Sequence, residues 1–243
     1  MAFDLAERLQ TPVFVMLDLD IGMNDWLCAP LAWDDNRKYD RGKIMTAQML
    51  EDGAKFGRYT DVDGDAIPWR TLPATHPSKG QYFTRGSSHD RMAKYSEEGS
   101  VYVDNMQRLL RKFETAKSLV PAPIRRDARE KTKIGAIYFG STSAAMDEAL
   151  AALEKQGIHL NTLRVRAFPF AEEVVEFVQA HDQVFVLEQN RDAQLQKLMV
   201  NECAIDPARF IGVLHYDGTP ITARFITSAI AERMKVTQKE AAE

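Results

Sequence analysis

The chain has 243 residues, of which 45% are apolar and 27% charged, and its formal net charge is −4. This composition is ordinary for a globular protein, and the slightly negative charge gives no reason to expect nucleic-acid binding. No apolar run approaches the roughly 20 residues of a membrane-spanning helix, so no membrane partner is expected. Cys28 and Cys203 are too few for a disulfide framework or a set of iron–sulfur ligands. Because no secretory signal follows Met1, we expect a cytoplasmic location.

The N-terminal segment reads as a helix followed by a strand. Ala2–Gln10 is amphipathic, Thr11-Pro12 breaks the pattern, and Val13–Leu17 (VFVML) predicts a buried strand. A lone strand cannot bury both faces, so its partner strands must come from elsewhere or the chain must be the rear part of a longer protein. We favour the second interpretation.

Residues 28–130 are irregular and rich in Gly, Pro, Asp and Arg. Two helices are predicted within them, at Ile44–Asp52 and at Val101–Leu119, and Pro121 and Pro123 end the second. So long a loop-rich stretch is uncommon in a compact domain. We therefore expect it to wrap across a surface or to join two domains.

Residues 131–243 alternate apolar runs with amphipathic runs, which predicts an α/β fold with a doubly wound, mainly parallel sheet. The predicted strands are Ile134–Phe139, Leu163–Arg166, Val184–Leu187 and Phe210–Leu214, and the last predicted helix is Ile221–Met234. The predicted organisation thus has three parts, 1–27, 28–130 and 131–243.

Polar residues gather where strands of this region lead into helices. These junctions are Gly140–Ser143, Arg166–Phe170 and Glu188–Gln194. Because such junctions lie along one edge of a parallel sheet, we expect them to be neighbours in space. Gly140–Ser143 can hold an anion on its amides and hydroxyls, although an ordinary tight turn with a helix cap explains it better.

The segment Glu188–Gln194 brings together a carboxylate, two amides and a guanidinium at the end of a central strand. Its candidate residues are Glu188, Asn190, Arg191 and Gln194. A contact with a ligand or partner subunit and internal bracing of the loop are equally good explanations. Arg166 is expected on the same edge, and an ion pair with Glu188 would be a purely structural role for both.

Two loops within residues 28–130 also contain candidate binding residues. Asp61–Asp65 (DVDGD) looks like a calcium loop, but the twelfth position is Leu72 where an EF-hand needs Glu, so a turn braced by Asp side chains is the better interpretation. The loop Thr84–Asp90 contains Arg85, Ser87 and His89, which can bind a carboxylate or phosphate or can pack as loop structure. No hydrolase triad or nucleophile elbow is present.

Several of these stretches together resemble the alpha subunit of 2-oxoacid:ferredoxin oxidoreductases, in particular the 2-oxoglutarate type. The matching stretches are AFDLAERLQTPVFVMLDLDIGMN, YTDVDGDAIPWRTLP, YFTRGSSHD, IGAIYFGSTSAAMDEAL, RVRAFPF and VFVLEQNRDAQL, in this order. The resemblance covers most of residues 2–201.

The resemblance implies a thiamine-diphosphate enzyme that decarboxylates a 2-oxo acid, forms an acyl-coenzyme A and reduces ferredoxin. It implies that residues 1–27 are a remnant of the pyrimidine-binding domain, 28–130 a connecting region and 131–243 a domain like the C-terminal domain of transketolase. It also implies that the beta subunit holds the diphosphate, its magnesium ion and the iron–sulfur cluster.

The family's alpha chain carries well over 200 further upstream residues, including a Tyr-Pro-Ile-Thr-Pro segment and the glutamate that activates the cofactor. Neither has a counterpart in this sequence, so no catalytic residue is assigned and the chain alone is expected to be inactive. Asp18, Asp20 and Asn24 follow the predicted strand and are expected near a subunit interface or the active site. Arg85 and Arg191 are candidates for attracting an anionic substrate, coenzyme or partner. The alternatives are a non-catalytic assembly module and a stand-alone α/β domain that binds a small anion.

Overall fold

The computed structural model describes residues 1–240, with side chains up to residue 235. Contacts divide the chain into two compact units. The first contains Met1–Val15 and Cys28–Val120, and the second contains Met16–Leu27 and the chain from Pro121 onward. The units are described separately below.

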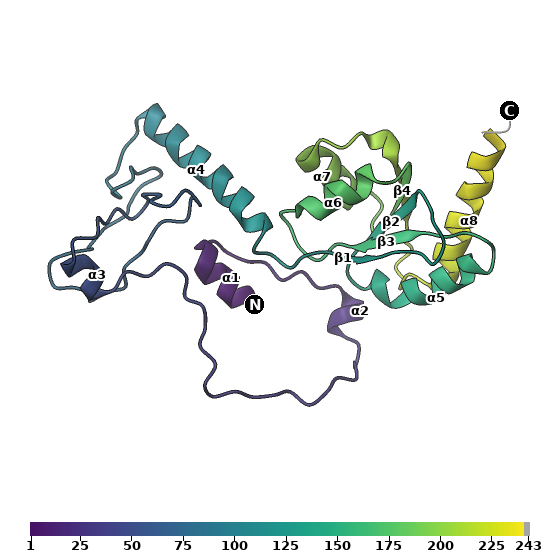
Figure 1. Ribbon diagram of the computed structural model, residues 1–243, viewed down its shortest axis with the longest axis horizontal. Coiled ribbons are helices and arrows are strands. Elements are labelled where there is room, and N and C mark those ends of the chain that lie inside the picture. Colours follow the sequence, from purple (N-terminus) through teal and green to yellow (C-terminus); the bar gives the residue numbers. More distant parts are fainter. Residues whose placement is uncertain (241–243) are drawn as a thin grey trace. The chain divides into compact units, whose positions relative to one another are not determined.

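The first unit contains three helices joined by long irregular segments (Figure 1). They are α1 (Ala2–Leu9), α3 (Ala47–Glu51) and α4 (Gly99–Lys117). Its small apolar core joins Leu5 and Leu9 of α1 to Ile67 and to Ala116 of α4. Because so little apolar surface is gathered there, the loops of this unit depend on side-chain hydrogen bonds and ion pairs for their shape.

Both helices predicted in the irregular region are confirmed, with different ends. α3 begins late because Ile44 forms a β-bridge with Arg70 and the Thr46 hydroxyl accepts a hydrogen bond from the Met49 amide at 3.2 Å. That bond caps the helix at its observed first turn. α4 ends just before Ser118, three residues ahead of Pro121.

The predicted buried strand Val13–Leu17 is wrong for this chain. The segment has no regular secondary structure, and Phe14 and Met16 are 83% and 84% exposed. A strand needs a neighbour to satisfy its backbone groups, and within residues 1–240 no segment pairs with this one. Apolar sequence alone therefore does not produce the strand.

The second unit is an α/β domain around a five-stranded sheet with strand order β1-β3-β2-β4-β5 (Figure 1). The strands are β1 (Ile124–Arg126), β2 (Ile134–Tyr138), β3 (Asn161–Arg164), β4 (Gln183–Glu188) and β5 (Phe210–Leu214). All pairings are parallel except that of β1, an antiparallel edge strand that the sequence analysis did not predict. The expected mainly parallel α/β fold is confirmed.

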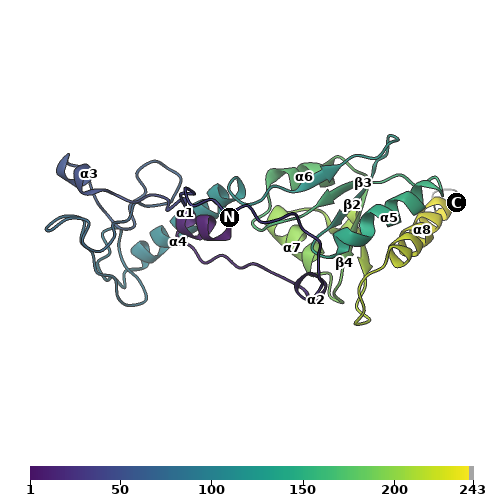
Figure 2. The same cartoon turned by 90° about the horizontal axis from the view of Figure 1, so that it is seen from below.

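Helices cover both faces of this sheet (Figures 1 and 2). The helices of this unit are α2 (Leu19–Gly22), α5 (Thr142–Glu154), α6 (Glu172–Gln179), α7 (Gln194–Cys203) and α8 (Ala223–Glu240). Successive residues of a strand point to opposite faces, so Phe185 of β4 packs with the α5 and α8 core and Val186 with the α6 and α7 core. A strand buried on both faces explains why β4 is almost wholly apolar.

The order of the strands places a topological switch between β2 and β4. The chain leaves β2 through α5 toward β3 on one side, and it then returns through α6 to β4 on the other side of β2. In open α/β sheets the carboxyl ends of the strands at such a point form a crevice. The residues that follow Tyr138 of β2 and Glu188 of β4 therefore lie at this crevice. Within residues 1–240, no helix has the length and apolar character that a bilayer crossing demands.

Candidate functional site

The junctions after β2 and β4 meet through Gln189. Its side-chain amide nitrogen lies 2.8 Å from the Ser141 hydroxyl and 3.2 Å from the Thr142 hydroxyl. Its carbonyl oxygen lies 3.4 Å from the Ile221 amide, near the start of α8. The expectation that Gly140–Ser143 and Glu188–Gln194 are neighbours is thus confirmed at the switch point between β2 and β4.

A carboxylate of the same unit occupies the junction after β2. The Ser141 hydroxyl donates a hydrogen bond of 2.6 Å to Asp18 Oδ2, and the backbone N–H of Ser141 also faces this carboxylate. Asp18 Oδ1 accepts a 2.9 Å bond from the Ile21 amide and so caps α2. The segment Gly140–Ser143 therefore does hold an anionic group, and that group is Asp18.

These hydrogen bonds act on the acidity of Asp18. Burial by itself would raise the pKa of this carboxyl, but bonds from the Ser141 hydroxyl and from the Ile21 and Ser141 amides outweigh burial and lower the pKa below its ordinary 3.8. Asp18 consequently stays ionised at neutral pH and suits the role of an internal acceptor. Asp20 lies in α2, and Asn24 lies exposed two residues after it.

Glu188 is fully buried at the end of β4 and braces the next helix. Its two carboxylate oxygens accept hydrogen bonds from the Leu195 amide at 2.8 Å and the Gln196 amide at 3.0 Å. The Asn190 side chain donates a third bond of 2.7 Å. A carboxylate at the first turn of α7 satisfies amides that have no partner within the helix and interacts favourably with the helix dipole.

In the rest of the Glu188–Gln194 segment, some side chains brace the loop and others are exposed. The Asn190 side-chain oxygen accepts bonds from the Asp192 and Gln194 amides at 3.1 and 3.2 Å. Arg191 is exposed and pairs with its neighbour Asp192 at 2.8 Å. Internal bracing explains Glu188 and Asn190, whereas Arg191 and the exposed Gln194 side chain are accessible to a ligand or partner.

Arg166 does not form the ion pair with Glu188 that was considered as its structural role. Its guanidinium donates instead to the Ala122 carbonyl at 3.4 Å. The backbone amides of α7 and Asn190 surround the Glu188 carboxylate, so this carboxylate needs no cation. Arg166 remains exposed just after β3.

The second set of candidates lies in the first unit, in the loop Thr84–Asp90. Arg85 is exposed and lies over the Tyr95 ring at 5.9 Å. The His89 ring stacks on Tyr59 with 3.8 Å between ring centres and an angle of 8° between their planes. Ser87 and His89 both line a cavity beside α4. The loop is therefore ordered by aromatic contacts, and part of it faces open space.

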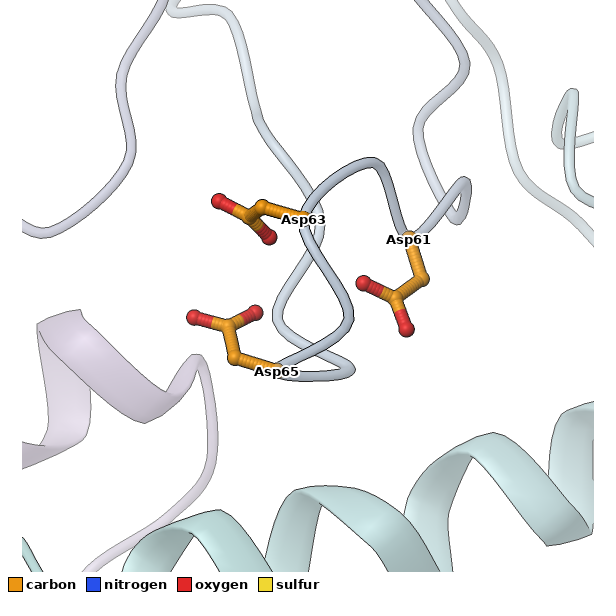
Figure 3. A group of neighbouring side chains, drawn as sticks. All are labelled: Asp61, Asp63 and Asp65. Atoms are coloured by element: carbon orange, nitrogen blue, oxygen red, sulfur yellow. The ribbon is translucent and has the colours of Figure 1, made fainter.

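The Asp61–Asp65 loop holds a lysine. Figure 3 shows the three carboxylates of Asp61, Asp63 and Asp65 on one turn. The Lys43 ammonium group lies 2.6 Å from Asp63 and 2.7 Å from Asp65, and it also donates to the Ile67 carbonyl at 3.0 Å. Asp61 accepts from the Gly64 amide at 2.9 Å, as expected for a braced turn. The Lys43 ammonium group therefore occupies the position beside Asp63 and Asp65 where a metal ion would bind.

The sequence analysis missed four residues around His89, namely Arg58, Tyr59, Arg108 and Lys112. One signal could have found two of them: Arg108 and Lys112 are four residues apart in α4, so they share a helix face. Both are buried, whereas Arg111 of the same helix is exposed. Burial depends on which face of α4 meets the loops, and the sequence pattern did not reveal this.

Comparisons with known proteins agree with the resemblance seen in the sequence. No protein-family model matches the chain. The chain is 25% identical over 236 residues to 2-oxoacid:ferredoxin oxidoreductase 2, subunit alpha, of Aeropyrum pernix, which covers 94% of this chain and 35% of the relative. It is 23% identical over 226 residues to the 2-oxoacid:ferredoxin oxidoreductase subunit alpha of Saccharolobus solfataricus, which covers 90% of this chain and 34% of the relative.

These homologues are alpha subunits of 2-oxoacid:ferredoxin oxidoreductases. The chain spans about a third of the length of these curated relatives. Among solved structures, 2-oxoglutarate:ferredoxin oxidoreductase from Magnetococcus marinus, with 2-oxoglutarate, coenzyme A and succinyl-CoA bound, matches with a TM-score of 0.78. That match has 18% identity and covers 94% of this chain and 38% of the neighbour, so it supports the fold.

Proposed function

We propose that this chain is part of the alpha subunit of a thiamine-diphosphate-dependent 2-oxoacid:ferredoxin oxidoreductase. The reaction is the oxidative decarboxylation of a 2-oxo acid to an acyl-coenzyme A with reduction of ferredoxin. We propose 2-oxoglutarate as the 2-oxo acid. We also propose that the three predicted parts, 1–27, 28–130 and 131–243, are a pyrimidine-domain remnant, a connector and a domain like the C-terminal domain of transketolase.

One observation carries the proposal. The similarity to the alpha subunits runs through 94% of the chain, across both the irregular first unit and the α/β second unit. A shared α/β domain alone would match only the second unit, because that fold serves many unrelated functions. Similarity that also includes the loop-rich unit favours a specific relationship.

The cofactors of such an enzyme are assigned to other parts of the complex. The group of three acidic side chains that could hold a metal among the described residues is Asp61, Asp63 and Asp65, and Lys43 forms ion pairs with the last two. Two cysteines cannot supply the four thiolates of an iron–sulfur cluster. We therefore propose that magnesium, the diphosphate and the cluster are held mainly by the beta subunit, and that this chain alone is inactive.

The structure weakens the alternative of a stand-alone domain that binds a small anion at Gly140–Ser143. The Ser141 hydroxyl and amide already bind Asp18, so a ligand there would have to displace a carboxylate of the same unit. A non-catalytic assembly module remains the second candidate, favoured by exposed apolar side chains such as Phe14, Met16 and Leu27. An activity measurement on the complex separates it from the main proposal.

The test is production of the chain with a candidate beta subunit, with and without the alpha-subunit region that completes the length of the relatives. The complete complex should reduce methyl viologen only when both a 2-oxo acid and coenzyme A are present. Among 2-oxoglutarate, pyruvate and 2-oxoisovalerate, 2-oxoglutarate should give the highest kcat/KM. The chain with the beta subunit alone should show no reduction.

Arg85→Ala and Arg191→Ala, made in the complete complex, test the two exposed cations. We expect one of them to raise a substrate KM or to weaken assembly, because each presents a guanidinium that an anionic ligand or partner can reach. Unchanged KM values and assembly in both variants would remove these residues from the proposal. A complete complex that reduces no viologen with any 2-oxo acid would reject the proposed function itself.

A further inference from the structure

A cavity of about 310 Å³ lies in the first unit, between α4 and two loops. Its walls are formed by Gln10, Arg58, Tyr59, Pro68, Ser87, Ser88, His89, Tyr102, Asn105, Met106, Arg108, Leu109 and Lys112. One loop supplies Arg58 and Tyr59, and the other supplies the residues from Ser87 to His89. Ser87 and His89 are the site candidates that line this cavity, and no residue at the edge of the sheet lines it.

Three cations line the cavity, and no acidic side chain among the described residues does. Arg108 and Lys112 are 8% and 7% exposed, which is rare for charged groups without a carboxylate partner. Of the carboxylates near Arg108, Asp104 is bound by Arg91 through bonds of 2.8 and 2.6 Å. Asp61 also acts on Arg108, but its carboxylate lies 3.9 Å from Arg111, so the positive charge in the cavity is compensated only in part.

Polar atoms in the cavity wall also lack hydrogen-bond partners. Among the described residues, none bonds to Arg58 Nη1, Arg108 Nε, Ser88 Oγ, His89 Nδ1 or Gln10 Oε1, and all five atoms are buried. An unpaired buried polar group costs free energy, more so when it is charged. Four of these five groups can donate to an anion, the Ser88 hydroxyl by rotating, whereas Gln10 Oε1 can only accept.

The neighbouring groups hold Arg58 and Arg108 in place. Arg58 lies over the rings of Tyr59 at 4.9 Å and Tyr82 at 5.6 Å, and Arg108 lies 5.7 Å from the Tyr59 ring centre. Arg108 also donates to the Ala66 carbonyl at 3.2 Å. These contacts fix two guanidinium groups at one wall before any ligand binds, and such preorganisation lowers the cost of binding.

The neighbouring positive charges also affect the pKa of Lys112. Burial, and then repulsion from Arg108 and Arg58, lower its pKa from 10.5 to about 8. Its ammonium group bonds to the Thr11 hydroxyl and, at 3.5 Å, to the Gln10 carbonyl, neither of which carries charge. A bound anion would relieve the repulsion among the three cations.

We propose that this cavity is a binding site for the phosphate group of an anionic ligand. Phosphate is favoured over a monocarboxylate because three cations and several further donors converge, and guanidinium groups bind phosphate oxygens in a bidentate manner. The cavity volume is about 310 Å³. That space exceeds a bare phosphate, so a phosphate monoester also fits. The proposal does not depend on the proposed function.

The test is titration of the full 243-residue chain at pH 7 with inorganic phosphate, with adenosine 5′-monophosphate and with acetate, followed by calorimetry and by thermal unfolding. Phosphate or the monoester should bind and raise Tm, and acetate should bind at least tenfold more weakly. Equal Kd values for phosphate and the monoester would identify free phosphate as the ligand. A monoester Kd at least tenfold lower would identify a larger phosphorylated ligand.

Variants locate the site. Arg58→Gln and Arg108→Gln should each raise the Kd for the better ligand at least tenfold. Arg111→Gln removes an equal charge from an exposed position of α4 outside the cavity, and it should change the Kd less than twofold. If Arg108→Gln does not fold, Arg58→Gln and Lys112→Gln, checked by circular dichroism, carry the test.

Three results would overturn the proposal. The first is that neither phosphate nor the monoester binds to the folded chain. The second is that acetate binds as tightly as phosphate, which would show a general anion site. The third is that Arg111→Gln weakens binding as much as Arg58→Gln, which would show a net-charge effect.

Discussion

The Ser141 hydroxyl donates a 2.6 Å hydrogen bond to the carboxylate of Asp18, a residue 123 positions earlier in the sequence. Gln189 donates to the same hydroxyl at 2.8 Å. This chain of contacts attaches the segment Met16–Leu27 to the carboxyl ends of β2 and β4, where an open α/β sheet ordinarily offers its ligand crevice.

Ser141→Ala should loosen the attachment of α2. The variant removes the hydroxyl that links Asp18 to Gln189, and we expect a loss of roughly 0.5–1.5 kcal/mol in the free energy of unfolding. Hydrogen exchange at the Ile21 and Met23 amides should become faster. Ser143→Ala is the control, because that hydroxyl bonds only locally, to the Gly140 carbonyl at 3.0 Å. Equal exchange rates in the two variants would contradict this prediction.

Acid should detach the same segment. The folded-state pKa of Asp18 lies below the unfolded value of 3.8, so this carboxylate contributes stability that is complete above pH 3.8 and is lost as the pH falls through the folded-state pKa. The protection factor of the Ile21 amide, measured by NMR against the intrinsic exchange rate at each pH between 6 and 2.5, should fall in that range. Asp18→Asn should show low protection at every pH, and a wild-type profile in this variant would exclude Asp18 as the titrating group.

Glu188→Ala should destabilise the second unit by roughly 2–4 kcal/mol. The change leaves the Leu195 and Gln196 amides and the Asn190 side chain without their buried acceptor. Glu188→Gln keeps one acceptor oxygen and should lose less. Urea denaturation measures both, and Glu202→Ala on the exposed face of α7 should change stability by less than about 0.5 kcal/mol. Similar losses in Glu188→Ala and Glu202→Ala would be inconsistent with the capping role.

Calcium should not stabilise the wild-type chain. Lys43 bonds to both Asp63 and Asp65, and although its burial lowers the pKa of this lysine, these bonds raise the pKa above 10.5. Lys43→Met should lower Tm, and millimolar CaCl₂ should restore part of the loss because the carboxylates then face one another without a cation. A Tm increase of the wild-type chain with calcium would show that the lysine gives way to the metal.

Lys112 should make the stability of the first unit increase at alkaline pH. Its pKa is about 8 in the folded chain and 10.5 in the unfolded chain, so the unfolded chain binds more protons between these values. The contribution of Lys112 to the free energy of unfolding should therefore rise as the pH increases from about 8 to 10.5. Lys112→Met should remove this rise in urea denaturation, whereas Lys117→Met, at the exposed end of α4, should retain it.

Most regular elements of the second unit could be predicted from the sequence, although the edge strand β1 and the short helix α2 could not. Apolar runs such as Val184–Leu187 are long enough and isolated enough to specify buried strands, and amphipathic runs with capping residues specify the helices between them. That pattern also determined that Ser141 and Gln189 would meet, because parallel strands with helical crossovers bring their carboxyl ends to one edge.

The partners of these polar groups depend on tertiary packing. Asp18 and Ser141 meet across 123 residues, and Lys112 becomes buried against Arg58 and Arg108, through packing that no local pattern encodes. Val13–Leu17 shows that a strand predicted from the sequence also depends on tertiary contacts. Its residues favour a strand, but a strand forms only where another strand supplies hydrogen bonds, and propensity cannot provide the neighbour.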